Sequence, residues 1–238
     1  MRIVAASVLV AALAWSVACS SGGFFQRFEY EEDVYLELNG DAGVYVNGST
    51  AALNALRGAS FDTAPGATIE REAVRAFFTT PVTRVTRITQ STRSGRRFLH
   101  VRLETDGIAR LSAAAPLSWS SYGFEKDGNV FIYRQAVGAS ASREVGEVGW
   151  TGDERVAFRL HLPSAVVYHN AGAEGLKRGN ILVWEQLLAD RLRGEPLEFD
   201  ARIEERSILS RTLLLFGATI VMVALMFAVV IWRVVRRG

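Results

Sequence analysis

A single apolar segment near the C-terminus constrains this chain more than any other feature. The run from Leu213 to Trp232 covers 20 residues, and its only polar side chain is Thr219. A helix of that length rises about 30 Å, which matches the hydrocarbon thickness of a bilayer. We therefore predict a transmembrane helix over residues 210–233. It contains no acid or histidine that would indicate an ion pathway, so we interpret it as an anchor.

The charges that flank this segment predict its orientation. Arg233, Arg236 and Arg237 follow it, whereas the two arginines that precede it are accompanied by two glutamates. Positive charge concentrates on the cytoplasmic side of a membrane helix. We therefore expect a single-pass protein of the cytoplasmic membrane, with residues 234–238 as a cytoplasmic tail and the body outside the cytoplasm.

The N-terminus has the three parts of a secretory signal peptide over residues 1–18. Arg2 is the positive region, residues 3–15 are apolar, and Ser16, Val17 and Ala18 form a small-residue cleavage site ahead of Cys19. We expect either lipidation of Cys19, with residues 19–23 as a lipid-anchor linker, or ordinary cleavage that leaves a free thiol. Both stay open because Ser16 stands where the lipobox of bacterial lipoproteins prefers leucine.

Composition excludes several classes for the remaining body. Apolar residues make up 49% and charged residues 22%, which excludes bulk disorder. Five of the 27 basic residues lie outside positions 20–209, so the body holds 22 basic and 25 acidic residues, a net charge of −3. That balance argues against nucleic-acid binding. One cysteine also excludes an internal disulfide or a cysteine metal cluster.

The body, residues 24–206, reads as one α+β domain built mainly on antiparallel sheet. Short helices are expected over 49–56, capped by Ser49 and ended by Gly58, and over 68–78, 106–114 and 186–193. In the second of these, Ile69, Ala73, Ala76 and Phe77 have helical spacing, so we expect them to share the face toward the core. Alternating apolar residues and turn signals predict strands over 27–39, 43–46, 82–91, 96–104, 122–125, 130–134, 156–162, 165–168, 180–184 and 197–203.

Several of these features occur together in one group of proteins. The leader with its lone cysteine, the strand Val34–Gly40, the segment Gly179–Glu185, and a strand ahead of a span with an arginine tail resemble the LppM-type membrane-anchored bacterial lipoproteins. The resemblance covers nearly the whole chain in architecture but only short stretches in residues. It implies a strand-rich ectodomain of unknown function in the cell envelope, without known catalysis, that binds or handles envelope lipids.

Catalytic and metal-binding motifs do not occur in the sequence. The three histidines, His100, His161 and His169, are not spaced as metal pairs, and we expect structural roles for them. Of the three, His169 has the best position for a ligand, in a loop flanked by glycines. Neither Gly-x-Ser-x-Gly, Ser-x-x-Lys nor a Walker loop is present. We therefore predict no enzyme, no cofactor and no metal site.

Acidic residues cluster at Glu29, Glu31, Glu32 and Asp33. They lack the spacing and the glycine of a calcium loop, so we expect a solvated edge that kinks the first strand. Elsewhere, Trp119, Trp150 and Trp184 are expected to fill the core. If the body has a ligand-binding site, we expect the glycine-rich loops over 137–153 and 171–179 to form its entrance.

The strongest charge asymmetry lies in one predicted hairpin. No acid occurs between Ala73 and Leu103. Strand alternation places Val85, Arg87 and Thr89 on one face of the first strand, and Arg96, Phe98, His100 and Arg102 on one face of the second. We predict an anionic-ligand site made of the following arginines: Arg84, Arg87, Arg93, Arg96, Arg97 and Arg102. The alternative is an arginine-decorated sheet edge that discourages strand pairing.

From the sequence we expect a non-catalytic, membrane-anchored lipoprotein that binds envelope lipid or another anionic amphiphile. An alternative from a different class is a protein-interaction subunit of a cell-envelope complex. A change of the tail helix should abolish the function of an interaction subunit but leave that of a lipid binder intact.

Overall fold

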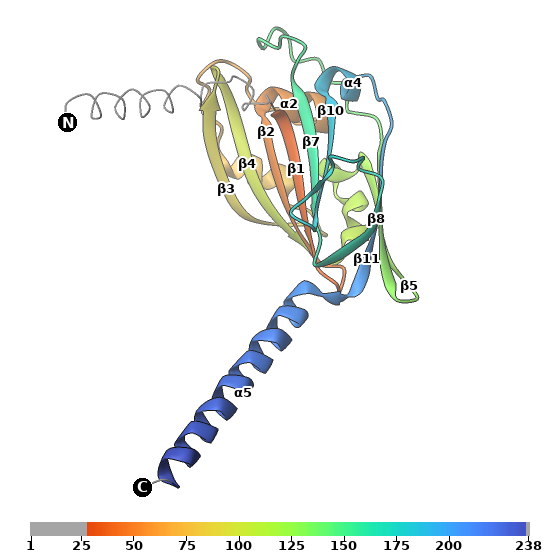
Figure 1. Ribbon diagram of the computed structural model, residues 1–238. Coiled ribbons are helices and arrows are strands. Elements are labelled where there is room, and N and C mark those ends of the chain that lie inside the picture. Colours follow the sequence, from red (N-terminus) through yellow and green to blue (C-terminus); the bar gives the residue numbers. More distant parts are fainter. Residues whose placement is uncertain (1–27, 237–238) are drawn as a thin grey trace, which may run out of the picture.

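The computed structural model of this protein describes residues 28–236. The predicted signal peptide, Cys19, the linker over 19–23 and residues 24–27 lie outside the described residues. The described chain forms a strand-rich body followed by one long C-terminal helix (Figure 1).

The larger of the two sheets has seven strands, and most pairs of neighbouring strands in it are antiparallel. Strands β1 and β7 pair in parallel, with Val34 opposite Leu160. The order across this sheet is β3 (Arg84–Arg93), β4 (Arg96–Thr105), β2 (Ala42–Ser49), β1 (Phe28–Leu36), β7 (Arg155–His161), β10 (Ile181–Leu187) and β9 (Leu176–Lys177).

The smaller sheet has four antiparallel strands, and a tight turn at Gly128 joins two of them, which contain the strands predicted over 122–125 and 130–134. Its last strand in the chain, β11, leads directly into the C-terminal helix. The order across this sheet is β5 (Ser120–Asp127), β6 (Val130–Val137), β11 (Leu197–Ser207) and β8 (Ser164–His169).

Short helices follow the strands. As predicted, Ser49 caps α2 (Thr50–Arg57) by accepting from the Ala52 amide at 3.0 Å, and Gly58 ends it with a φ of 72°. That left-handed conformation suits glycine. The others are α3 (Arg71–Phe78), the 3-10 helices η1 (Ile108–Ala113) and η2 (Ala115–Leu117), and α4 (Leu188–Leu192).

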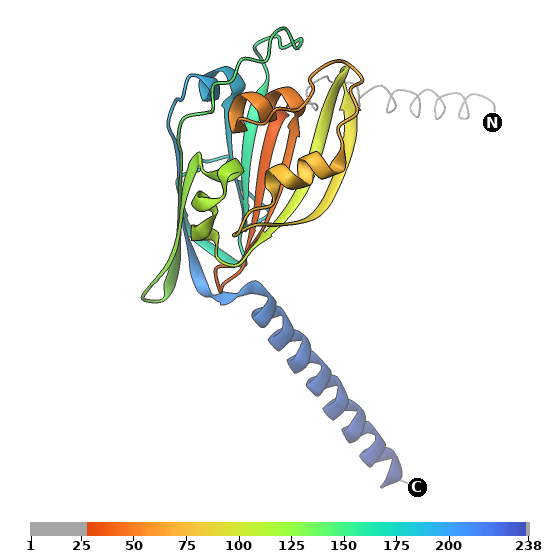
Figure 2. The ribbon, with the colours of Figure 1, turned by 180° about the vertical axis from the view of Figure 1, so that it is seen from behind.

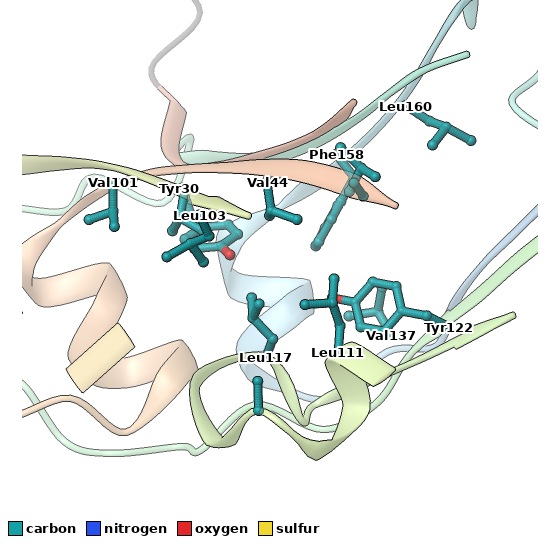
Figure 3. Close-up of a cluster of buried hydrophobic side chains, with 14 of the residues drawn as sticks. Tyr30, Val44, Val101, Leu103, Leu111, Leu117, Tyr122, Val137, Phe158 and Leu160 are labelled. Carbon is teal, nitrogen blue, oxygen red and sulfur yellow. The ribbon is translucent and has the colours of Figure 1, made fainter. Parts of the chain in front are cut away.

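One face of the large sheet is covered and the other is not. Seen from behind, α2 and α3 lie across the sheet, with η1 and the small sheet beside them (Figure 2). Figure 3 shows Val101 and Leu103 of β4 facing the layer that contains Leu111 and Leu117. We call this covered side the inner face. The opposite, outer face carries no helix or second sheet in the described chain (Figure 1).

The C-terminal helix α5 (Ile208–Val235) leaves the body without packing along it (Figure 1). Its stretch Thr212–Arg233 is long and apolar enough to span a membrane, as predicted. Leu214, for example, is 72% exposed. Such a continuous apolar surface requires lipid or another apolar cover.

Four details of the predicted fold are wrong. The first strand runs through its acidic residues without a kink that interrupts pairing, and β2 continues through Asn47 and Gly48 to Ser49. In α3 the buried residues are Val74 and Phe78, whereas Ala73 and Ala76 are exposed. The helix expected over 186–193 begins only at Leu188, because Gln186 and Leu187 belong to β10, whereas the helix expected over 106–114 is present as the 3-10 helix η1. The three tryptophans lie in or against the core, as predicted.

Candidate functional site

Strand alternation separates two chemically different faces of the large sheet. Val44 and Val46 of β2 are buried on the inner face, whereas Tyr45 and Asn47, which alternate with them, point outward. On β4, Leu99, Val101 and Leu103 are buried, and Arg102 is exposed. The period of two along each strand therefore gathers polar side chains on the outer face.

Two arginines meet on this face. Arg87 of β3 and Arg102 of β4 are direct register partners. A bulge between Val85 and Arg87 reverses the alternation, so Val85 is buried inside while Arg87 points out. The prediction that Val85 and Arg87 share a face is therefore wrong. In the described part of the chain, the side chain of Arg87 has no hydrogen bond or ion pair.

A hollow of about 300 Å³ surrounds this pair. His100 lines this hollow. Its Nδ1 lies 3.0 Å from Asn47 Oδ1, to which it donates because an amide oxygen only accepts, and its Nε2 lies 2.8 Å from the Ser91 hydroxyl. Partial burial lowers the pKa of His100, with Arg93 adding to that effect and Glu31 opposing it. The hollow is lined by Tyr45, Asn47, Arg87, Thr89, His100, Val101 and Arg102.

An aromatic row continues from the hollow across the sheet. The Arg102 guanidinium lies 4.5 Å from the centre of the Tyr45 ring. The centres of the Tyr45 and Tyr35 rings are 4.5 Å apart. Tyr35 in turn stacks on His161 at 4.0 Å and is 39% exposed. Because β1 is the neighbour of both β2 and β7, these rings form a row beside the arginine pair, in which Tyr45 is tilted by 41° against Tyr35.

The other four predicted arginines have partners in the protein. Arg84 pairs with Glu104, and Arg93 donates to the Phe28 carbonyl and stacks on Phe98. Arg97 donates to the Ala67 carbonyl at 2.9 Å. Arg96 binds Glu29 at 2.7 Å and also donates to the Gly149 carbonyl. Of the six predicted residues, only Arg87 and Arg102 therefore meet in the hollow.

The predicted solvated acidic edge is wrong, because arginines neutralise these acids within the fold. Glu31 and Asp33 both bind Arg159 on the outer face, with Glu31 at 2.7 Å. Glu29 is fully buried against Arg96 and Trp150. Glu32 points to the inner face, so alternation separates it from the others and prevents all four from meeting at one ion.

Sequence reasoning missed Tyr35, Tyr45 and Asn47 as members of this face. Their alternation with Val34, Val44 and Val46 indicates that they face away from the core. The sequence near each strand, however, does not indicate which strands pair in the sheet. The predicted binding loops over 137–153 and 171–179 do not line the hollow. His169, the preferred histidine, lies on β8 in the other sheet.

Comparisons with known proteins give only distant similarities. No protein-family model matches the sequence, and no curated protein matches it. The chain is similar to the NMR structure of the folded domain of LppM from Mycobacterium tuberculosis, with a TM-score of 0.43 and 12% identity over 77% of this chain and 94% of that one. It is also similar to an aminopeptidase N family protein from Idiomarina loihiensis, with a TM-score of 0.33 and 11% identity over 72% of this chain and 29% of that one.

Proposed function

We propose that this protein is a non-catalytic, membrane-anchored receptor for an anionic amphiphile, such as an envelope lipid, and that the hollow at Arg87 and Arg102 holds its anionic group. The observation that carries this proposal is the unneutralised pair of like charges. Two cations directly opposite each other on neighbouring strands destabilise a sheet. A bound anion would remove that repulsion.

The chemistry of the hollow suits a phosphate or carboxylate group. Guanidinium groups present forked donors that match such oxyanions, often with two hydrogen bonds each. Thr89 adds a hydroxyl close by. The acids on this face already bind other arginines and so compete little for the arginine pair. Glu104, two residues from Arg102 on β4, pairs with Arg84, and Glu31 and Asp33 bind Arg159.

The aromatic row supports an amphiphile over a free ion. Tyr45 and Tyr35 extend a partly apolar, aromatic surface away from Arg102. A ligand with an anionic group and an apolar or sugar portion would cover both parts, whereas inorganic phosphate would occupy only the hollow.

We further propose that α5 crosses the cytoplasmic membrane with the arginine tail inside the cell and the body outside, and that Cys19 carries a lipid. The charge distribution around the span and the leader sequence support this orientation. Strand β1 begins at the end of the body opposite α5 (Figure 1). Nine residues from Cys19 to Phe28 reach at most about 30 Å. If one bilayer holds both anchors, the body would lie beside the membrane.

The proposal can be tested on the full chain in a neutral, non-ionic detergent. We would titrate it with dihexanoyl phosphatidylglycerol and, separately, with zwitterionic dihexanoyl phosphatidylcholine, and follow intrinsic fluorescence. The apolar tails of the two lipids are identical, so any difference reports the headgroup charge. We expect saturable binding of the phosphatidylglycerol only, which weakens as salt screens the charges.

Two outcomes would contradict the proposal. Equal binding of both lipids would indicate an apolar pocket with no role for the arginines. Binding of neither would favour the interaction-subunit alternative. Titration with glycerol phosphate distinguishes the ligand class: affinity equal to that of the lipid would identify a free phosphate ligand.

A further inference from the structure

A second, separate feature is an arginine buried without a counter-charge. Arg191 of α4 is completely buried. Within the described chain, the one hydrogen-bond partner of its guanidinium is the Gln186 side chain, whose Oε1 lies 3.5 Å from Nη1. Among the described residues, its Nε and Nη2 have no partner. A buried guanidinium in this state is costly, because desolvation penalises the charge and one long hydrogen bond to a neutral amide compensates little of that cost.

A second buried guanidinium lies close by. Helices α2 and α4 are in contact at the end of the body away from α5 (Figures 1 and 2). Arg57 of α2 lies 3.6 Å from the Trp119 ring centre, and Arg191 lies 5.9 Å from the same ring. Arg57 Nη1 and Trp119 Nε1 are also buried without a partner in the described chain. The cluster therefore holds unpartnered donors and no unpartnered acceptor.

The charges of this cluster do not balance. Glu32 binds Arg57 and also accepts from Tyr30 and Tyr122, so it neutralises one of the two cations. Glu195, whose charge acts on Arg191, is in an ion pair with the exposed Arg193 instead. Burial lowers the pKa of Arg191, and Arg57 adds to this effect. Residues 1–27 contain no aspartate or glutamate, so they cannot supply a side-chain counter-charge.

We propose that this cluster binds one small monovalent anion, of the size of chloride, between Arg57 and Arg191 beside Trp119. Such an ion takes about the room of one water molecule. It would accept hydrogen bonds from the unpartnered guanidinium donors and neutralise the excess charge, which a water molecule cannot do. The ion would tie α2 to α4, which are far apart in the sequence and adjacent in the fold.

Bromide is a suitable probe for this site. The melting temperature of the full chain in neutral detergent would be measured as sodium bromide replaces sodium gluconate at constant ionic strength. A bound anion stabilises the folded state by mass action, and we expect a saturable rise of about 3 °C or more. The rise should be lost in Arg191→Met and kept in Arg193→Met, which removes an exposed, paired arginine two residues away on the chain.

A second readout does not depend on the stability of the Arg191 variant. Bromide bound beside the Trp119 ring should quench its fluorescence in a saturable way, and this component should be absent from Trp119→Phe. Identical melting temperatures in bromide and gluconate, without saturable quenching, would overturn the proposal and leave ordered water as the occupant. An equal bromide response in Arg191→Met would also overturn it. Neither result depends on lipid binding at the outer face.

Discussion

Arg87 and Arg102 face each other across β3 and β4, and neither binds a carboxylate in the described part of the chain. The pair arises because a bulge after Val85 shifts the outward face by one residue. Without that bulge Arg87 would point toward the core. The sheet thus holds two like charges at its surface beside an aromatic row, where an anion of the right size would relieve their repulsion.

Removing one arginine of the pair should stabilise the ligand-free protein. In Arg87→Gln we expect the free energy of unfolding to rise by about 0.5 kcal/mol, because the cross-strand repulsion is lost. The difference should shrink at high salt. Arg71→Gln, which removes one exposed charge from α3, serves as the control and should change little. Chemical unfolding measures both, and destabilisation by Arg87→Gln would contradict this interpretation.

Arg96 should behave as a structural residue. Arg96→Gln leaves Glu29 buried without its ion pair, so we expect a loss of about 2–4 kcal/mol in the free energy of unfolding. Arg84→Gln breaks only an exposed pair with Glu104 and should cost less than about 1 kcal/mol. Lipid affinity should be unchanged in folded Arg96→Gln. A large loss of affinity with little loss of stability would instead place Arg96 in the binding site.

The buried Glu32 should be among the most sensitive positions. Glu32→Gln leaves the Arg57 guanidinium without its counter-charge, and we expect a loss of about 3–5 kcal/mol. The double variant Glu32→Gln/Arg57→Met removes both charges and should recover much of that stability. Denaturant unfolding of the two variants gives the comparison. If the double variant is as unstable as the single one, charge imbalance is not the cause.

His100 predicts the direction of a pH dependence. Burial holds its folded-state pKa below the ordinary value of 6.5, so the unfolded chain takes up a proton that the folded chain resists. Its contribution to stability is present above about pH 6.5 and is lost as the pH falls toward the lowered value. His100→Gln should reduce this fall, measured as the unfolding free energy at about pH 7.5 and about pH 5.5. An identical pH profile in both proteins would exclude His100 as its source.

Local sequence signals predicted the elements well and their neighbours poorly. The hairpin of Arg84–Arg93 with Arg96–Thr105 and the cap at Ser49 depend on residues close in the chain, so pattern and turn chemistry predicted both. The pairing of β1 with β7 joins Val34 to Leu160, and no local pattern encodes it. We predicted that Glu31 and Asp33 are solvated because their partner, Arg159, lies on β7, and the sequence does not indicate that β7 pairs with β1.

In the candidate site, too, local sequence predicted some features, and long-range contacts determined the others. Arginine enrichment identified the hairpin, but a single extra residue at the bulge decided that Arg87 faces outward. Long-range contacts decided that Arg96 and Arg97 bind carbonyls or acids from other segments. Tyr35 and Tyr45 join the site only because β1 and β2 are neighbours in the sheet.

The most direct test of the outer-face site is the affinity of two charge-matched variants for dihexanoyl phosphatidylglycerol. Arg87→Gln/Arg102→Gln removes the pair, and Arg71→Gln/Arg110→Gln removes two exposed arginines from other elements. We predict that the first variant raises the dissociation constant roughly tenfold or more, because charge-assisted hydrogen bonds are lost, and that the second changes it little. Equal effects of the two variants would show that net charge alone attracts the lipid and would contradict a site at Arg87 and Arg102.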